Sequence, residues 1–330
     1  MRSMLRFVMV SLVYISAMSM SLQAQQPPAW AYAIPSAEEA AITAEARRER
    51  ALDTSLKSLP GSDLQFIRAQ ISNRYGPADW FPGDHPQMPN IVAYGKQGAE
   101  VFACSLCHMA NGKGRPENAP VSGLPVDYFL QQMYDFRDGK RNTGEPRKGN
   151  VQRMIHFAKE MTEEEMRAAA EYYGSMPWTP WIRVVETETV PKMRIQGGMH
   201  LPLEGNAREP IGNRIIETPE NPEHTEILRD PRSGFIAYVP VGSLKKGEEL
   251  VTTGGGKTTQ CAICHGPGLK GLGPVPGIAG RSPSYMMRQL YDMKVGARAG
   301  DWTRLMEPVV APLSEEDLLN IVAYMSSLAP

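Results

Sequence analysis

Two copies of the motif Cys-x-x-Cys-His constrain this 330-residue chain more than any other feature. The first copy is CSLCH at 104–108, and the second is CAICH at 261–265. The chain contains 4 cysteines, and the two motifs use all of them, so none remains for a long-range disulfide. Stability must therefore come from packing or from a bound group.

Three kinds of chemistry use closely spaced cysteines. A zinc site usually needs four protein ligands, and each motif supplies three. A thioredoxin-like redox pair needs a βαβ context, which this sequence lacks. Covalent attachment of haem c accounts for every part, because cysteines three apart share one helical face and the adjacent histidine reaches the iron. The motifs predict two covalently bound haem c groups, with thioethers at Cys104, Cys107, Cys261 and Cys264 and iron ligands at His108 and His265.

The sequence that follows each motif is also repeated. At the offset between the two motifs, YFLQQMYDFRDGKR (128–141) aligns with YMMRQLYDMKVGAR (285–298). After a length difference in one loop, MTEEEMRAAAEYYGSM aligns with LSEEDLLNIVAYMSSL. The last pair begins with capping-box patterns at Thr162 and Ser314, and the first pair has apolar residues at helical spacing. Self-similarity of this kind predicts two copies of one small helical domain, copy one and copy two.

The sixth iron ligand is predicted to be a methionine, as is typical of electron-carrying cytochromes. Met154 and Met306 occupy matching places, each shortly before the apolar residue that precedes the last helix of its copy. His156 is a rival in copy one, although its counterpart in copy two is a proline, which cannot bind iron. His85 and Met88 are minor candidates from the N-terminal region.

These residues make each half resemble the class I c-type cytochromes, and the tandem resembles dihaem cytochromes of the c4 type. The resemblance rests on C-x-x-C-H, a proline-bearing loop, Tyr-x-x-x-Gln, Gly-x-Arg, a methionine and the final helix. It implies two all-α domains with His/Met haems and a role in periplasmic electron transfer. It also implies that loop prolines orient the ligand histidines and that two arginines and two tyrosines hydrogen-bond haem propionates. The alternative for these four side chains is that the arginines are surface charges and the tyrosines are packed rings. The residues concerned are Pro120 and Pro276 for the histidines, and Arg141, Arg298, Tyr134 and Tyr291 for the propionates.

Two segments lie outside the repeat. Residues 25–90 contain two helical stretches, 36–53 and 63–76, and then a proline-rich piece that Trp80 and Phe81 predict to be ordered. Residues 179–238 alternate β-branched and polar residues, which predicts short strands with His200 and His224 at the surface. The predicted order is a signal peptide (1–24), an N-terminal helical extension (25–90), cytochrome c domain 1 (91–178), an inter-domain insert (179–238) and cytochrome c domain 2 (239–330).

The first residues predict export. Arg2 and Arg6 precede an apolar run at 7–20, and Ala24 supplies the small residue that a signal peptidase prefers. The run is shorter than the roughly 20 residues that cross a bilayer. We therefore expect a periplasmic protein with no membrane span in the mature chain.

The predicted function is electron transfer rather than catalysis. A formal net charge of -1 gives no reason to expect nucleic acid or an anionic membrane as a partner. We expect redox partner proteins, with a dehydrogenase as donor and a carrier or oxidase as acceptor, and the basic run at 137–148 as a candidate contact. The alternative is a haem-based oxidoreductase, peroxidase-like or thiosulfate-dehydrogenase-like, whose axial ligand is displaced. The resembled thiosulfate enzymes use a cysteine ligand, and none is spare here. No residue is predicted to be catalytic.

Overall fold

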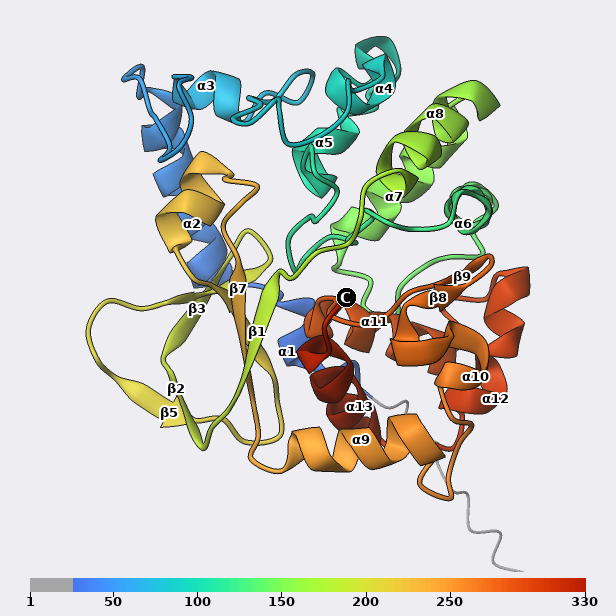
Figure 1. The fold of residues 1–330 in the computed structure, drawn as a ribbon. Coiled ribbons are helices and arrows are strands. Elements are labelled where there is room, and N and C mark those ends of the chain that lie inside the picture. The colour runs from blue at the N-terminus through green and yellow to red at the C-terminus, as the bar shows by residue number, and fades with distance from the viewer. Residues whose placement is uncertain (1–25) are drawn as a thin grey trace, which may run out of the picture.

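The computed structural model describes residues 26–330, so the predicted signal peptide lies outside the described residues. The described chain has four parts, which are the N-terminal extension, copy one, a β-rich insert and copy two (Figure 1). The helices of copy one occupy the upper half, the helices of copy two lie below them, and a β-rich insert stands to one side. Among the described residues, no helix combines the length and the apolar character needed to cross a membrane.

Copy one is a helical unit in which the long helix α6 packs against α7 and α8, and the motif helix α5 lies beside them. The last helix begins at a capping box, since the Thr162 hydroxyl accepts from the Glu165 amide and the Glu165 side chain accepts in return. Three glutamates in its first turn also favour the positive end of the helix dipole. Its elements are α4 (Asn90–Ala93), η1 (Gln97–Ala99), α5 (Cys104–His108), α6 (Val126–Arg137), α7 (Gly149–Glu160) and α8 (Glu163–Gly174).

Copy two repeats this plan with two local differences. The counterpart of α7 is split into two short helices, and a two-residue hairpin follows the motif. Its first and last helices cross closely at Gly247, where an added Cβ would lie 2.0 Å from the carbonyl oxygen of Asn320. Its elements are α9 (Ser243–Thr253), α10 (Ala262–His265), η3 (Pro267–Leu269), β8 (Gly271–Leu272), β9 (Val275–Pro276), α11 (Pro283–Lys294), η4 (Asp301–Leu305), α12 (Glu307–Val310) and α13 (Glu315–Ser327).

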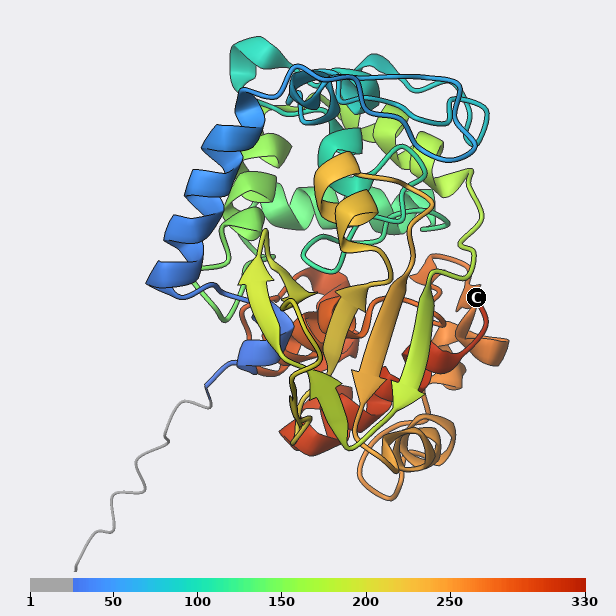
Figure 2. The same cartoon turned by 90° about the vertical axis from the view of Figure 1, so that its left-hand side faces the viewer.

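The insert forms a three-stranded sheet of order β1-β7-β6, in which β7 runs parallel to β1 and antiparallel to β6 (Figure 2). Ala237 and Val239 of β7 are buried in the core of copy two, so the sheet and that copy share one core. The short strands predicted for the insert are therefore present, and the all-α fold class is only partly right. The insert comprises β1 (Ile182–Glu186), β2 (Thr189–Pro191), β3 (Met193–Gln196), β4 (Met199–Pro202), β5 (Arg208–Pro210), β6 (Ile216–Pro219), the π-helical turn η2 (Glu223–Leu228) and β7 (Phe235–Val239).

The extension contains α1 (Ala29–Tyr32), α2 (Ala37–Ala51) and α3 (Arg68–Ile71). The helix predicted at 63–76 is reduced to the single turn α3. Before α3, Phe66 forms an isolated β-bridge with Lys57, and after it the chain forms turns. Trp80 and Phe81 are buried, which confirms that the proline-rich piece is ordered. The Trp80 indole donates to the carbonyl of Leu228, 2.7 Å away, and so ties the extension to the insert.

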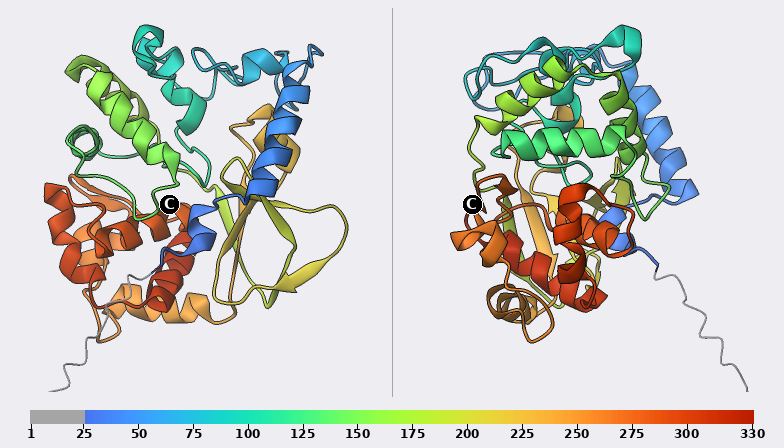
Figure 3. Two further views of the ribbon diagram at one scale, coloured as in Figure 1. Left: turned by 180° about the vertical axis from the view of Figure 1, so that it is seen from behind. Right: turned by 90° about the vertical axis from the view of Figure 1, so that its right-hand side faces the viewer.

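The start of the extension crosses the molecule and packs into copy two, although copy one follows it in sequence (Figure 3). Trp30, Ala31 and Tyr32 are buried in the core of copy two. The Tyr32 hydroxyl donates to Asp292 of α11 at 2.7 Å. His200, predicted at the surface, is instead buried, and its Nε2 donates to the carbonyl of Trp30. The extension therefore holds copy two and the insert together.

Candidate functional site

The motif helix of copy one, α5, sits between the domain core and the extension. Cys104 packs against the apolar core of copy one. The Ser105 hydroxyl donates to the carbonyl of Val92 at 2.8 Å, and the Ala103 amide donates to the carbonyl of Arg74 at 2.9 Å. These contacts fix the face of α5 that presents its two cysteines and the following histidine.

The two motif histidines have the same environment. His108 Nδ1 donates to the carbonyl of Ala119, and His265 Nδ1 donates to the carbonyl of Pro276, each at 2.8 Å. Because a carbonyl can only accept, the proton lies on Nδ1 and the lone pair of Nε2 is available to a metal. Burial lowers the pKa of both imidazoles, which keeps them in the neutral form that binds iron.

Of the two prolines predicted to orient a motif histidine, Pro276 does so and Pro120 does not. In copy one the carbonyl that accepts from the histidine belongs to Ala119. The carbonyl of Pro120 accepts instead from Arg281, at 3.1 Å. The repeat offset already pairs Ala119 with Pro276, so spacing was the better guide than residue type. What the histidine needs is a carbonyl at that position, and any residue supplies one.

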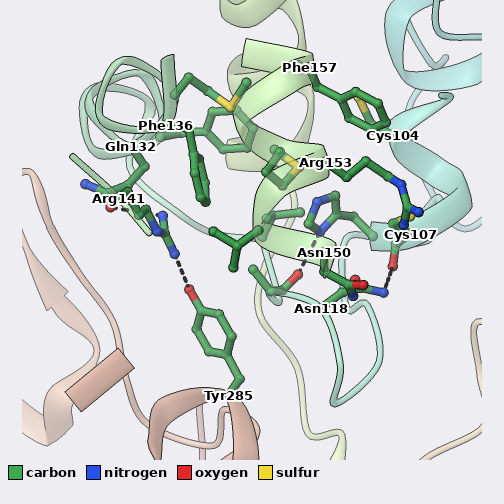
Figure 4. A pocket seen from close by; sticks show the side chains of 18 of the residues that line it. Cys104, Cys107, Asn118, Gln132, Phe136, Arg141, Asn150, Arg153, Phe157 and Tyr285 are labelled. Atoms are coloured by element: carbon green, nitrogen blue, oxygen red, sulfur yellow. Dashed lines mark hydrogen bonds between the residues drawn. The ribbon is translucent and has the colours of Figure 1, made fainter. Parts of the chain in front are cut away.

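A large pocket brings together the predicted site residues of copy one (Figure 4). Cys104, Cys107, His108 and Met154 all line it. It encloses about 1380 Å³ of space, part of it open to solvent. Its wall is mostly apolar and includes Phe136 and Phe157, while α11 of copy two closes one side. The α11 residues in the wall are Tyr285, Arg288, Gln289 and Asp292.

The two rival ligands of copy one occupy different places. Met154 is half-buried on α7 and lines the pocket, whereas His156 is exposed and its Nε2 donates to the carbonyl of Ala99. Neither of the two minor candidates lines the pocket. His85 bonds Asp79 at 3.1 Å, and Met88 packs against the core of copy one.

The counterparts in copy two are placed by local structure. Cys261 packs against the core of copy two, and Cys264 is exposed. Met306 is half-buried at the junction of η4 and α12, where its carbonyl accepts from the amides of Val309 and Val310. It therefore begins the short helix that replaces the second half of α7.

The thiols and carboxylates do not form a conventional metal or redox site. Burial raises the pKa of Cys104 to about 12 and that of Cys261 to about 11, so neither thiol is an activated thiolate. Within residues 26–330, no three His, Cys, Asp or Glu side chains gather to hold a metal ion. Thioether attachment is compatible with such buried, un-ionised sulfur atoms.

Basic side chains buried between the two copies test whether a haem fits. Arg141, Arg288, Arg298 and Lys148 are each less than a tenth exposed. Arg288 and Lys148 donate to backbone carbonyls, and the Nε of Arg298 has no partner in the described residues. Burial and the nearby Arg288 lower the pKa of Lys148 to about 7. Buried cations are costly without anions, and the two propionates of a haem supply them beside an apolar ring, so the residues present fit this group.

The repeated arginines form a reciprocal cluster across the domain interface. Arg141 donates to Gln132 of its own copy and to Tyr285 and Gln289 of the other. Arg298 donates in mirror fashion, to Gln289 of its own copy and to two acceptors of copy one. Those two acceptors are the hydroxyl of Tyr128 and the amide oxygen of Gln132.

The residues of this cluster are among those that the two copies have in common. All six members occur as pairs at the repeat offset, so the repeat marks an interface as well as a fold. A backbone bridge between Arg141 and Arg298 joins the same two segments. The sequence paired these tyrosines and glutamines without giving them a role. Tyr134, in contrast, does not line the pocket, and its hydroxyl donates to Glu163.

The basic run at 137–148, expected as a candidate partner contact, is only partly at the surface. Arg141 and Lys148 are buried at the interface. Arg137 pairs with Glu163 at 2.8 Å, and Arg147 pairs with Glu145 at 2.6 Å. Two of the five cations of the run are therefore inside the molecule, and the other three each lie beside a carboxylate.

Comparisons with known proteins agree with this architecture. The Cytochrome c family model matches residues 95–177 and 244–329, which is half of the chain. A cytochrome c4 of Stutzerimonas stutzeri is 36% identical over 238 residues, covering 69% of this chain and 86% of that protein. A thiosulfate dehydrogenase electron acceptor of Thiomonas intermedia is 24% identical over 231 residues, covering 69% of this chain and 79% of that protein.

Among solved structures, a thiosulfate dehydrogenase of Marichromatium purpuratum is similar with a TM-score of 0.46 and 22% identity. The match covers 71% of this chain and 38% of that one. The family model, matched once in each half, and the cytochrome c4 relative give the assignment. The chain belongs to the cytochrome c family as a tandem of two class I domains, and it is an electron-transfer protein with two covalently bound haem c groups.

Proposed function

We propose that this protein is a periplasmic relay that takes electrons from a donor dehydrogenase and passes them to a downstream carrier or oxidase, without catalysis at either iron. The observation that carries the proposal is the reciprocal cluster around Arg141 and Arg298, because it fixes one cytochrome c domain against the other. A relative named as the electron acceptor of a thiosulfate dehydrogenase supports a carrier role and makes such an enzyme one candidate donor.

The residues that hold the haems are assigned within this proposal. Each bound haem c supplies a one-electron iron couple. Cys104 and Cys107 of α5 would anchor one group, and Cys261 just before α10 and Cys264 within it would anchor the other. His108 with Met154, and His265 with Met306, would be the iron ligands. The pocket supports the copy-one set, because both cysteines, His108 and Met154 line it. We place the two domains at 91–178 and 239–330, joined by the insert.

The chain's own residues set the conditions for electron exchange. Carbonyls hold the two histidines in one orientation, so the iron ligands need little rearrangement when the charge on the iron changes. Phe136, Phe157 and Met133 exclude water from the pocket wall. A thioether ligand favours the reduced iron and raises the potential, as suits a carrier that accepts electrons.

The alternative is a haem oxidoreductase whose axial methionine is displaced by substrate. Steady-state assays of the holoprotein distinguish the two. With an artificial donor and peroxide, or with thiosulfate and an artificial acceptor, we expect no turnover above background, while both haems are reduced by ascorbate. Turnover at tens per second, within the ordinary range of enzymes, would contradict the carrier proposal.

A further inference from the structure

The surface beside the haem-binding motif differs between the two copies, although its sequence positions correspond one to one. The repeat offset is constant from the first cysteine through the carbonyl that holds the histidine. Each residue of the loop at 109–115 therefore has a structural counterpart in the loop at 266–272. The two loops can be compared position by position.

In copy one the insert covers this loop. The Asn111 amide donates to the carbonyl of Pro231 at 2.7 Å. The Lys113 ammonium lies 4.8 Å from the ring centroid of Trp181, a cation–π contact. Arg115 is buried and donates to the carbonyl of Thr225. The cover thus supplies an aromatic ring, backbone acceptors and the carboxylate of Glu226, which lies 3.5 Å from Arg115, to a loop that carries cations.

In copy two the same positions face solvent. The counterparts of Lys113 and Arg115 are Lys270 and Leu272, and both are exposed. Within the motif itself, Ile263 is 62% exposed, whereas its counterpart Leu106 is only partly so. Figure 1 shows the reason, since α10, β8 and β9 lie on the opposite side of the molecule from the insert sheet. We call Ile263, Lys270 and Leu272 the copy-two face.

The chemistry of the copy-two face is apolar with a positive charge. The segment 254–276 contains two lysines and no acidic residue, and one of these, Lys257, pairs with Asp317 at 2.7 Å. That leaves Lys270 as the charge beside the two exposed apolar side chains. A surface that complements it has an apolar centre and an acidic rim, which resembles what the insert offers to copy one.

We propose that external redox proteins dock on the copy-two face, and that the insert closes the equivalent face of copy one to them. This inference rests on the proposed relay function and names the port, which is the surface where the partner docks. The partner is an acidic redox protein with an apolar patch. Electrons from it reach copy one through copy two. The basic run at 137–148 is a weaker candidate for the port, because two of its cations are buried and the other three lie beside carboxylates.

The test uses the holoprotein and an acidic flavodoxin in its fully reduced form as the protein donor. In each encounter the anionic flavin hydroquinone loses one electron and becomes the neutral semiquinone, one ferric haem iron gains that electron, and no proton is transferred. Ascorbate serves as a small donor that needs no docking. Lys270→Glu and Ile263→Glu change the copy-two face, and Leu52→Glu adds the same charge at an 82% exposed site on the extension.

We expect Lys270→Glu and Ile263→Glu each to lower the flavodoxin rate constant about tenfold at low ionic strength, with the Lys270→Glu loss shrinking as salt rises. Leu52→Glu should stay within about twofold of wild type, as should all three variants with ascorbate, since the change is in docking alone. Equal flavodoxin rates in wild type and both copy-two variants would overturn the proposal.

Two other outcomes are separable. A wild-type dimer that Ile263→Glu dissociates, measured by sedimentation, would make the occupant a second copy of this chain and would also overturn the proposal. Failure of ascorbate and flavodoxin alike to reduce the wild-type haems would instead refute the relay function on which the proposal rests.

Discussion

Removing one hydroxyl group, in Tyr32→Phe, tests whether the N-terminal extension is part of the folded unit of copy two. The Tyr32 hydroxyl is buried and donates to Asp292 Oδ1 at 2.7 Å. Burial and the neighbouring Asp292 raise the pKa of Tyr32 far above its usual value, so the phenol keeps its proton and remains the donor. The substitution leaves the ring in place and removes only this donor.

The expected loss follows from the partner and the burial. A hydrogen bond to a buried carboxylate contributes about 2 kcal/mol. After the change Asp292 Oδ1 keeps the amide of Gly144, 2.7 Å away, as a donor from the described part of the chain. At roughly 2 cal/mol/K of unfolding entropy per residue, a chain of 330 residues that unfolds as one unit would lose about 3 °C in melting temperature. Urea unfolding of the holoprotein, followed by near-ultraviolet circular dichroism, measures the free energy directly.

Tyr134→Phe is the matched control, because Tyr134 makes the same kind of bond at the surface. Its hydroxyl donates to Glu163 at 2.6 Å in an exposed position. Exposed polar contacts of this kind contribute about 0–1 kcal/mol. Equal losses in the two variants, or a loss below about 0.5 kcal/mol in Tyr32→Phe, would refute the view that burial of the Asp292 bond stabilises the extension against copy two.

Two further predictions concern single side chains. Met154→Ala should abolish the methionine–iron absorption band of one haem and lower its potential, since a thioether favours ferrous iron, whereas His156→Ala should leave the spectrum unchanged; the reverse pattern would show that His156 is the ligand. The hydrogen bond to Asp79 raises the pKa of His85 in the folded state. The stability that this bond contributes is therefore fully present below about pH 6.5, and it is lost as the pH rises through the raised pKa of His85. Unfolding free energies measured from pH 6 to 9 should therefore fall more steeply in wild type than in His85→Gln, and parallel curves would contradict this.

The features that could be predicted from sequence are those that depend on local pattern or on the repeat. The capping boxes at Thr162 and Ser314 mark where the last helices begin. The strands of the insert follow from alternating residues such as those of β7, which alternate between buried and partly buried side chains. The motif histidines also fall in equivalent environments, as their equal spacing implies.

The features that could not be predicted depend on contacts between distant segments. Nothing local to Trp30 or Tyr32 indicates that α1 enters the core of copy two, because the residues that receive it lie far along the chain. His200 resembled a surface residue and is buried only because the carbonyl of Trp30 reaches it. Lys148 belonged to a basic run, but the fold places it inside, where only the joined copies can enclose it.

The interface cluster lies between these two cases. The repeat offset identifies Arg141 and Arg298 as a pair, but residues matched in two copies can each serve their own domain. Only the assembled structure shows that each arginine crosses to the tyrosine of the other copy. A repeat therefore predicts equivalent positions, while their contacts require the relative placement of the copies.

The most direct test of the central claim is a reductive titration of the purified protein, combined with the mass of the denatured chain. Two covalently bound haems predict a mass increased by two haem groups and an uptake of two electrons per chain. Cys261→Ala should weaken the attachment in copy two while copy one stays loaded. A mass with one haem, haem that acid acetone extracts, or an uptake of one electron would contradict the account.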